Sequence, residues 1–491
     1  MLVVISDIHL TDGTGGSTVS PGAFIVFAER LRDLAFSASW RANGQYRPLE
    51  RIDLLLLGDV LDIIRSSRWI DEGVRPWHDW TSADFSAVTH RITADLLEHN
   101  KASLQVLRGL AHEGAVRIPP ANAAWQPAHR TESQPVPVHI HYFVGNHDWF
   151  LHLPGEAYDS MREIVVQHMG LSNPSGEPFP HDPEESSQLL EVLGQHGVFA
   201  RHGDIFDAFN YEGDRNASSL GDAIVIELLN RFIVEVEREL AEELPAATIL
   251  GLRELDNIRP LLLAPVWIDG LLERSCPFPS QRQKVKQIWD RLADEFLELR
   301  FVRERDTWNP NDLVDGLQRA LKFSRRVSIG WASWIVNWLA KISASGDGSL
   351  YTHALAEKEF RNRRAKHIVY GHTHHAECIP LDASYTEAGV LNQVYFNSGT
   401  WRRVYRQTRL APHEHEFVAA DEMHYLAFFR NDERSGRPYE TWSGTLGLDV
   451  TSGVTYRVDA GGEGHAGSKP ISASSLYGRS SRYPLPTRQP Q

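Results

Sequence analysis

Residues 54–62 read Leu-Leu-Leu-Leu-Gly-Asp-Val-Leu-Asp. Four consecutive leucines that stop at glycine and aspartate predict a strand buried on both faces, as in a parallel sheet covered by helices. The carboxyl end of such a strand delivers Asp59 to the crevice where open α/β sheets bind their ligands. We therefore expect an α/β fold with a site at this strand end.

Four further apolar runs end in side chains of the types that bind metal ions. These side chains are Asp7 and His9 after residues 3–5, Asn146 and His147 after residues 142–144, His202 after residues 198–200, and His372 and His374 after residues 368–370. Aspartate, asparagine and histidine thus recur at strand ends in chain order. This recurrence predicts one shared site.

Length, composition and net charge limit the classes of protein to which the chain can belong. The 491 residues suffice for two or three average domains, or for one enlarged α/β domain with insertions. A hydrophobic share of 42% and a charged share of 23% are typical of an ordinary soluble protein. The net charge of -14 disfavours a general nucleic-acid or anionic-membrane surface, although it leaves a local basic groove open.

Cysteine count and hydropathy bear on location. Cys276 and Cys378 give neither a disulfide framework nor a cysteine-type zinc site. The first expected strand, residues 2–5, has no cleavable signal before it. No run approaches the ~20 apolar residues of a membrane span. We expect a cytoplasmic protein without a transmembrane segment.

The chain divides into four expected segments. Residues 1–215 and 361–458 alternate strand and helix patterns and are expected to form two parts of one domain, with helices near residues 23–36, 82–113 and 156–169. Residues 216–360 have helical periodicity and predict an inserted cap subdomain. Residues 459–491 are rich in Gly, Ser, Pro and Arg, which predicts a disordered tail.

The residue types at the strand ends suit phosphate-ester hydrolysis. That reaction needs a hydroxide at neutral pH and positive charge facing the phosphoryl oxygens, and two divalent metal ions ~3.5–4 Å apart supply both. Two ions so close need a bridging carboxylate, for which Asp59 is the candidate. Asn146 offers an amide oxygen. Mixed nitrogen and oxygen ligands without thiolate suit Mn, which we favour, or Fe, Zn or Co.

The ordered blocks D-x-H, G-D-x-x-D, G-N-H-D, a lone H and G-H-x-H, spread over residues 7–374, resemble the calcineurin-like metallophosphoesterase superfamily. The resemblance implies a mixed four-layer β-sandwich flanked by helices, here with a large helical insertion. It implies a first metal ion on Asp7, His9, Asp59 and His374 and a second on Asp59, Asn146, His202 and His372. It also implies that His147, oriented by Asp62, positions the phosphate or protonates the leaving oxygen. A carboxylate beside an imidazole favours the cationic form that this role needs.

The fourth block is a single residue, so alternatives lie nearby. His168, His181 and His196 precede His202, which we choose because it follows an apolar run and precedes Gly-Asp. Asp204 and Asp207 either orient His202 or begin the next loop. Residues 397–401, Asn-Ser-Gly-Thr-Trp, follow an expected strand and either line the pocket or form a turn.

Comparison with branches of the superfamily narrows the substrate. Ile63 follows Asp62 where the protein-phosphatase branch has a phosphate-binding arginine, which disfavours phosphoproteins. The acidic net charge disfavours an extended DNA footprint. Residues 202–207 look more like the bacterial branch that includes the UDP-2,3-diacylglucosamine pyrophosphatases. Their helical lid is much shorter than residues 216–360, so their substrate does not carry over.

One helix in the insertion bears on the substrate. Residues 327–342 place three tryptophans on one stripe after Lys322, Arg325 and Arg326. The stripe either grips an amphipathic phosphate ester or packs into the subdomain core, and we favour packing.

The expected function is a dinuclear-metal-dependent phosphoester hydrolase in which a metal-bridging hydroxide attacks a phosphomonoester, phosphodiester or pyrophosphate. The expected partner is a small phosphorylated substrate. Two alternatives remain: a metal-dependent nuclease, and a non-catalytic binding protein with the same fold.

Overall fold

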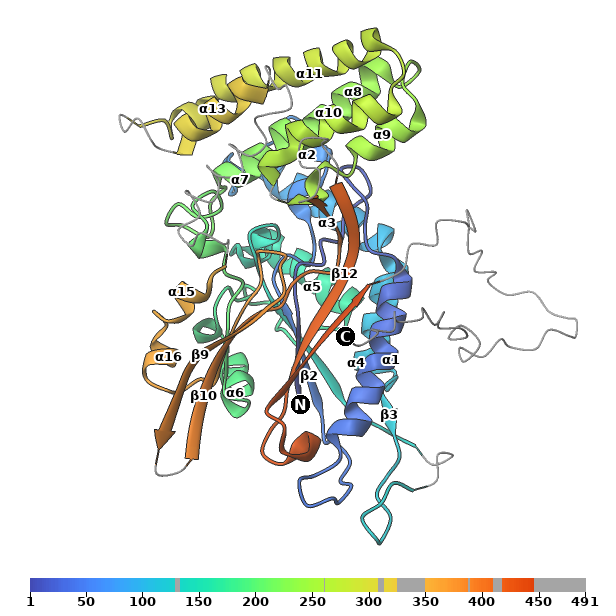
Figure 1. Cartoon of the computed structure of the whole chain (residues 1–491), viewed down its shortest axis with the longest axis vertical. Helices are drawn as coiled ribbons and strands as arrows, with labels where there is room; N and C mark the ends of the chain where they lie inside the picture. Colours follow the sequence, from blue (N-terminus) through green and yellow to red (C-terminus); the bar gives the residue numbers. More distant parts are fainter. Residues whose placement is uncertain are drawn as a thin grey trace, which may run out of the picture. The chain divides into compact units, whose positions relative to one another are not determined.

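The computed structural model describes residues 1–128, 133–259, 261–307, 313–324, 349–386, 389–408 and 417–445 (Figure 1). It is mixed α/β, with parallel and antiparallel strand pairs in its larger sheets, as the sequence predicts. Residues Met1–Gly447 form one compact unit. The four segment boundaries stay predictions. The expected tail, residues 459–491, and the tryptophan-rich helix, residues 327–342, lie outside the described residues.

The first sheet carries the strand on which the fold prediction rests. Its strands are β1 (Leu2–Ile5), β2 (Ile52–Leu57), β5 (Val138–Phe143), β7 (Ile258–Arg259), β11 (Arg403–Gln407), β12 (Phe417–Phe428) and β13 (Tyr439–Thr445). Their order is β5-β2-β1-β12-β11-β7, and β13 pairs with β12. All six residues of β2 are buried, which confirms the prediction of a strand covered on both faces. Strands β1, β2 and β5 are parallel, so their carboxyl ends share one edge.

The second sheet faces the first. It consists of β6 (Val198–Ala200), β8 (His367–Tyr370), β10 (Gly389–Asn397) and β9 (Glu377–Thr386), in that order. Because strand side chains alternate between faces, Leu55 and Leu57 of β2 join Val369 of β8 in one buried cluster between the sheets. Strands β6 and β8 are parallel, so their carboxyl ends also coincide. A two-stranded sheet, β3 (Arg117–Ile118) and β4 (Gln134–Pro135), is not hydrogen-bonded to either.

Helices cover the outer face of the first sheet. They are α1 (Pro21–Ala38), α3 (Ala83–His99), α4 (Lys101–His112) and α5 (Glu156–Met169). Their apolar stripes join the alternate residues of β1 and β2 in the largest buried cluster. The single helix expected over residues 82–113 is wrong, because Asn100 leaves helical geometry between α3 and α4. Its amide donates hydrogen bonds to the carbonyl oxygens of Leu96 and Thr11.

The remaining elements near the two sheets are short. They are α2 (Arg68–Asp71), α6 (Ser187–Gln195), α15 (Tyr351–Ala354), α16 (Lys358–Arg361) and the 3-10 helices η1 (Ile63–Arg65), η2 (Trp149–His152), η3 (Pro183–Glu185), η4 (Asp204–Phe206) and η9 (Glu433–Gly436). Leu350 and Ala354 pack against Tyr370 and Tyr395 on the outer face of the second sheet.

The described part of residues 216–360 is mainly helical, as predicted. Besides α15 and most of α16, its helices are α7 (Leu220–Ala223), the π-helix η5 (Ile224–Asn230), α8 (Arg231–Leu240), α9 (Ala246–Leu252), the 3-10 helices η6 (Leu255–Asn257) and η7 (Leu261–Leu263), α10 (Ala264–Ser275), α11 (Pro279–Glu298), α12 (Arg300–Arg303) and α13 (Leu313–Ser324). Figure 1 shows α8, α9, α10 and α11 gathered together. This segment also supplies β7, which pairs with β11 in parallel and so extends the first sheet. Among the described helices, none has the length and apolar character that crossing a membrane requires.

Candidate metal centre

The predicted ligands follow the carboxyl ends of five strands. They are Asp7 and His9 after β1, Asp59 after β2, Asn146 after β5, His202 after β6, and His372 and His374 after β8. The structure brings them together: Asp59 Oδ2 lies 3.2 Å from His202 Nε2 and 3.6 Å from His9 Nε2. His374 Nε2 lies 3.4 Å from Asp7 Oδ1. His168, His181 and His196 have other hydrogen-bond partners elsewhere.

The backbone at these positions is unusual. Among the described residues, ten non-glycine residues have positive φ, and five of the ten are Asp7, His9, Asp59, His372 and His374. A non-glycine residue in this region costs roughly 1–3 kcal/mol and persists only where the surrounding structure holds it. Such strain gathers at functional sites. The surrounding structure therefore holds the backbone of these five residues in the unusual conformation that places their side chains.

Two motif glycines are required by close approach. A Cβ atom on Gly145 would lie 2.3 Å from Asp59 Oδ1, and one on Gly58 would lie 2.5 Å from His202 Nδ1. Gly58 also has a φ of +83°, a conformation that side chains rarely adopt. The glycine before each polar residue in the G-D and G-N blocks thus makes room for the side chains of the centre.

We call the set Asp59, Asn146, His202 and His372 the His202 side of the centre. His202 is fully buried, and its Nδ1 donates a hydrogen bond to the carbonyl oxygen of Leu57 at 2.9 Å. In a neutral ring this leaves a lone pair on Nε2. That Nε2 atom and the buried Oδ1 of Asn146 make no hydrogen bond with any described residue. His202 Nε2 lies 3.2 Å from Asp59 Oδ2, and a cation that displaces its proton would be ligated by this nitrogen, by that carboxylate and by the Asn146 oxygen together.

A carboxylate that the prediction left open orients the last ligand on this side. Asp207 Oδ2 accepts a hydrogen bond from His372 Nε2 at 3.0 Å, which leaves Nδ1 of the neutral ring as the acceptor. Asp207 therefore orients His372 rather than His202. Asp204 instead forms an ion pair with Arg215 at 2.9 Å. His372 also donates its backbone N–H to both carboxylate oxygens of Asp7.

We call the set Asp7, His9, Asp59 and His374 the His9 side. Its imidazole nitrogens already have partners: His9 Nε2 lies 3.0 Å from His374 Nε2, and Arg259 Nη2 donates to His374 Nδ1 at 2.8 Å. Because a guanidinium only donates, the neutral His374 ring carries its hydrogen on Nε2. To ligate a cation through Nε2, His374 must lose the hydrogen bond from Arg259. Asp7, His9 and His374 still bring one ligand atom each within 4.8 Å of the others.

Asp62 holds two histidines with its two carboxylate oxygens. Its Oδ2 accepts from His9 Nδ1 at 2.9 Å, and its Oδ1 accepts from His147 Nδ1 at 2.7 Å. The backbone N–H of His147 donates to Asp59 Oδ1 at 2.8 Å, which fixes the loop on which His147 stands. Asp62 thereby turns Nε2 of both rings away from itself, as the predicted roles require.

Burial and mutual charge set the ionisation of the centre. Burial alone would lower the pKa of His147, but the carboxylates of Asp62 and Asp59 outweigh it and raise that pKa to about 10. The same balance raises the pKa of His202 to about 10, with Asp59 as the main opposing charge. Burial and the neighbouring Arg259 guanidinium hold the pKa of His374 well below its usual value. Proton and metal ion compete for such nitrogens, so occupancy of the centre would depend on pH.

Residues 397–401, which the sequence left open between pocket wall and turn, brace the centre. Thr400 Oγ1 donates to the carbonyl oxygen of Asp7 at 2.7 Å, and Asn397 Nδ2 donates to that of Gly371 at 2.7 Å. Ser398 Oγ lies 2.6 Å from Ser6 Oγ. These bonds join the ends of β1, β8 and β10.

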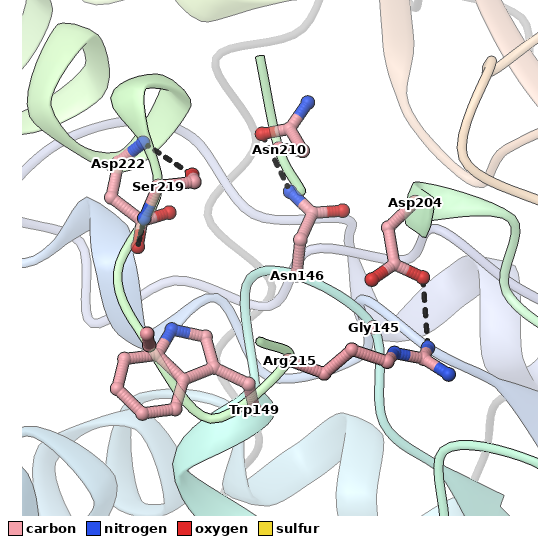
Figure 2. Close-up of a pocket in the computed structure, with 9 residues that line it drawn as sticks. Gly145, Asn146, Trp149, Asp204, Asn210, Arg215, Ser219 and Asp222 are labelled. Atoms are coloured by element: carbon pink, nitrogen blue, oxygen red, sulfur yellow. Dashed lines mark hydrogen bonds and ion pairs between the residues drawn. The ribbon is translucent and has the colours of Figure 1, made fainter. Parts of the chain in front are cut away.

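A small pocket adjoins the His202 side. Figure 2 shows Asn146 facing Asn210 across it, with the Asp204–Arg215 ion pair and Trp149 along its walls. Asn146 Nδ2 donates to Asn210 Oδ1 at 3.3 Å. Trp149 is 3% exposed, and its indole N–H has no hydrogen-bond partner among the described residues.

No protein-family model matches the chain, and a search of curated proteins returned no significant match. The two residues of the centre that the prediction did not assign are Asp207 and Arg259. Asp207 had a weak signal, since it follows His202 closely. Arg259 had none, because its place depends on how residues 216–360 fold.

Proposed function

We propose that this chain is a dinuclear-metal-dependent phosphoester hydrolase of the calcineurin-like metallophosphoesterase type. The observation that supports the proposal best is the convergence of two buried ligand atoms that make no hydrogen bond with a described residue, Asn146 Oδ1 and His202 Nε2, the latter 3.2 Å from the Asp59 carboxylate. Buried polar atoms rarely go without a partner, and these two belong to one predicted ligand set. The facing mixed sheets and the outer helices agree with the four-layer sandwich of that family.

The donor set fits two divalent cations of borderline character. Asp59, Asn146, His202 and His372 would hold one ion, and Asp7, His9, Asp59 and His374 would hold the other. Imidazole nitrogens with carboxylate and amide oxygens suit Mn, our first choice, and also Fe, Zn or Co. When bound, the two ions supply a hydroxide nucleophile at neutral pH and positive charge toward the phosphoryl oxygens.

The protein residues complete the reaction. Asp62 keeps the His147 ring oriented, so that a proton on Nε2 faces the site and can pass to the departing oxygen. The carboxylates of Asp62 and Asp59 maintain the cationic ring that such a donor needs. His147 retains 14% of its side-chain exposure, which gives a substrate access to it. A small phosphate ester is the substrate class that this arrangement serves.

Hydrolysis of bis(p-nitrophenyl) phosphate tests the proposal. The purified protein should turn over this diester with added Mn²⁺ and lose activity with a chelator. Asp59→Asn should lower kcat by about 10³-fold or more, because the variant weakens a ligand shared by both ions. The matched control is Asp214→Asn, an exposed carboxylate in the loop after Asp207. Equal rates in wild type and Asp59→Asn would contradict the proposed role of Asp59. A metal-loaded protein without turnover on any phosphate ester would favour the non-catalytic alternative.

A further inference from the structure

Three arginines surround a single carboxylate beside the His9 side of the centre. Arg65 lies in η1, Arg259 ends β7, Arg402 immediately precedes β11, and Asp256 lies in η6. We call Arg65, Arg259 and Arg402 the arginine cluster. The insertion supplies Arg259 and Asp256, whereas Arg65 and Arg402 come from the segments that follow β2 and β10. The cluster thus exists only where the insertion meets the sheet.

The positive charge of the cluster exceeds its compensation. Arg65 Nη1 and Arg402 Nη1 each lie 2.8 Å from the same atom, Asp256 Oδ2. Arg259 donates from Nη1 to the backbone carbonyl oxygen of Asp256 at 2.5 Å. Within the described residues, no other carboxylate lies within 4.0 Å of the three guanidinium groups. Counted over contacts within 4.0 Å, three cations and one anion leave a net charge of +2, while Asp62 and Asp7 of the centre act on Arg65 and Arg259 from farther away.

Burial makes this excess costly. Arg65 is 1% exposed, Arg402 is 6% exposed and Asp256 is 5% exposed. Arg65 Nε and Arg402 Nη2 have no hydrogen-bond partner among the described residues. A purely structural ion-pair network would satisfy its donors, because a buried charge without a partner is strongly unfavourable. The unused donors point to an anion that is part of the working site.

The position of the cluster indicates which kind of anion would bind to it. Arg259 Nη2 is 2.8 Å from His374 Nδ1, so the guanidinium borders a predicted metal ligand. Arg65 is three residues beyond Asp62, which holds His9 and His147. An oxyanion in contact with the cluster would therefore lie next to a phosphoryl group in the centre. Planar guanidinium groups bind carboxylate and phosphate oxygens in pairs.

We propose that the arginine cluster binds a second anionic group of the substrate. The substrate class is then a phosphate ester that carries a carboxylate or a further phosphate close to the scissile phosphorus. This inference rests on the proposed function, because the bound anion is part of a substrate only if the chain hydrolyses phosphate esters. The shared chemistry is an oxyanion, and Arg259, which is only partly buried and has no carboxylate partner among the described residues, is the guanidinium that would meet it first.

Matched 4-nitrophenyl phosphodiesters test the inference in the Mn²⁺-loaded full-length protein. Their second arm ends in a carboxylate, in a phosphate or in a neutral carboxamide of the same length. Wild type should show a kcat/KM about 10–100-fold higher for an anionic arm than for the carboxamide, the range of a charge-assisted hydrogen-bond pair. The preferred anionic arm identifies the oxyanion. Arg259→Gln should bring this ratio close to one, and Arg259→Lys should restore part of it.

The matched control is Arg300→Gln, a substitution at an arginine of the insertion whose side chain is 91% exposed, and it should keep the wild-type ratio. A purely structural role of Arg259 would change all three rates together and leave the ratio unaltered, which would overturn the inference. So would hydrolysis by wild type without preference for either anionic arm, although the proposed function would then stand.

Absence of turnover on all three diesters would instead count against the proposed function. Calorimetric binding of the corresponding non-hydrolysable phosphonates then decides the inference. Tighter binding of an anionic arm that Arg259→Gln removes would support it, and equal binding of all arms would overturn it. Near-ultraviolet circular dichroism of each variant verifies the fold.

Discussion

The His202 side and the His9 side share Asp59 but differ in how their ligand atoms are satisfied. On the His202 side, Nε2 of His202 and Oδ1 of Asn146 have no hydrogen-bond partner among the described residues. On the His9 side, His9 and His374 contact each other through Nε2, and Arg259 occupies Nδ1 of His374. On the first side a cation has to displace only the proton of His202, whereas on the second it must also break the hydrogen bonds of His374 with His9 and Arg259. We therefore expect two ions bound with unequal affinity.

Removing one histidine from each side gives the largest expected effects. His202→Ala should abolish the tighter Mn²⁺ site, and His9→Ala should abolish the weaker one. Either loss should lower kcat by about 10³-fold, since in the proposed mechanism both ions contribute to transition-state stabilisation. Calorimetric titration of the metal-free protein with Mn²⁺ measures both affinities. Equal affinities in wild type, or loss of the same site in both variants, would contradict the comparison.

Asp62→Asn sharpens the comparison, because Asp62 contacts His9 and His147 but no ligand on the His202 side. The amide retains the shape of the carboxylate but lacks its charge, so His147 loses the main charge that favours its cationic form. We expect kcat to fall about 100-fold or more. The tight Mn²⁺ affinity should stay near that of wild type. A loss of both ions would mean that Asp62 supports the whole centre, and titration with Mn²⁺ distinguishes the two results.

Asp207→Asn acts on the opposite side. The carboxylate orients His372 through Nε2, and the loss of such an outer partner typically costs 10–100-fold in metal affinity. The tight site should weaken by roughly this factor while the weak site is unchanged. Asp214→Asn in the same loop is again the control. An unchanged titration would show that Asp207 merely begins the next loop.

The residues that could be predicted from the sequence are those with a local signal. Asp7, Asp59, Asn146 and His202 each follow a short apolar run closely, and buried strands make such runs conspicuous. Parallel neighbours then bring the carboxyl ends together, so chain order alone suggests one site. The sheet class and the burial of β2 follow from the same hydrophobic pattern.

Arg259, Arg402 and Asp256 have no comparable signal. Their meeting depends on β7 pairing with β11, a contact between residues about 150 positions apart in the chain, as in Ile258 with Tyr405. No periodicity encodes such a long-range pairing. The break at Asn100 was missed for a related reason, because its side chain is held by Thr11 in a distant loop. Local pattern predicts the candidate ligands, whereas tertiary contacts decide what surrounds them.

The smallest expected effect concerns the stability of the fold at low pH. There, loss of metal ions from the two sides of the centre has to be distinguished from unfolding. His367, at the amino end of β8, packs among the rings of Phe396, Phe428 and Tyr439, with centroids 4.9–5.8 Å away. Burial, together with the neighbouring charge of Lys366, lowers its pKa from 6.5 to about 4. The unfolded chain therefore takes up this proton near pH 6.5 and the folded chain only near pH 4. Its contribution to stability is complete above pH 6.5 and is lost as the pH falls toward 4.

A pKa shift of this size corresponds to a loss of about 3 kcal/mol in the free energy of unfolding. His367→Phe removes the titrating group from an aromatic environment, so its free energy of unfolding should fall less steeply between pH 7 and pH 4.5 than that of wild type. Urea denaturation followed by tryptophan fluorescence measures both slopes, and the exposed His168→Phe on α5 serves as control. If the free energy of unfolding of His367→Phe fell with pH as steeply as that of wild type, the prediction would be wrong. Protonation of His367 would then not account for the loss of stability at low pH. If the slope is shallower, the variant extends to lower pH the range in which the two sides of the centre can be compared in a folded protein.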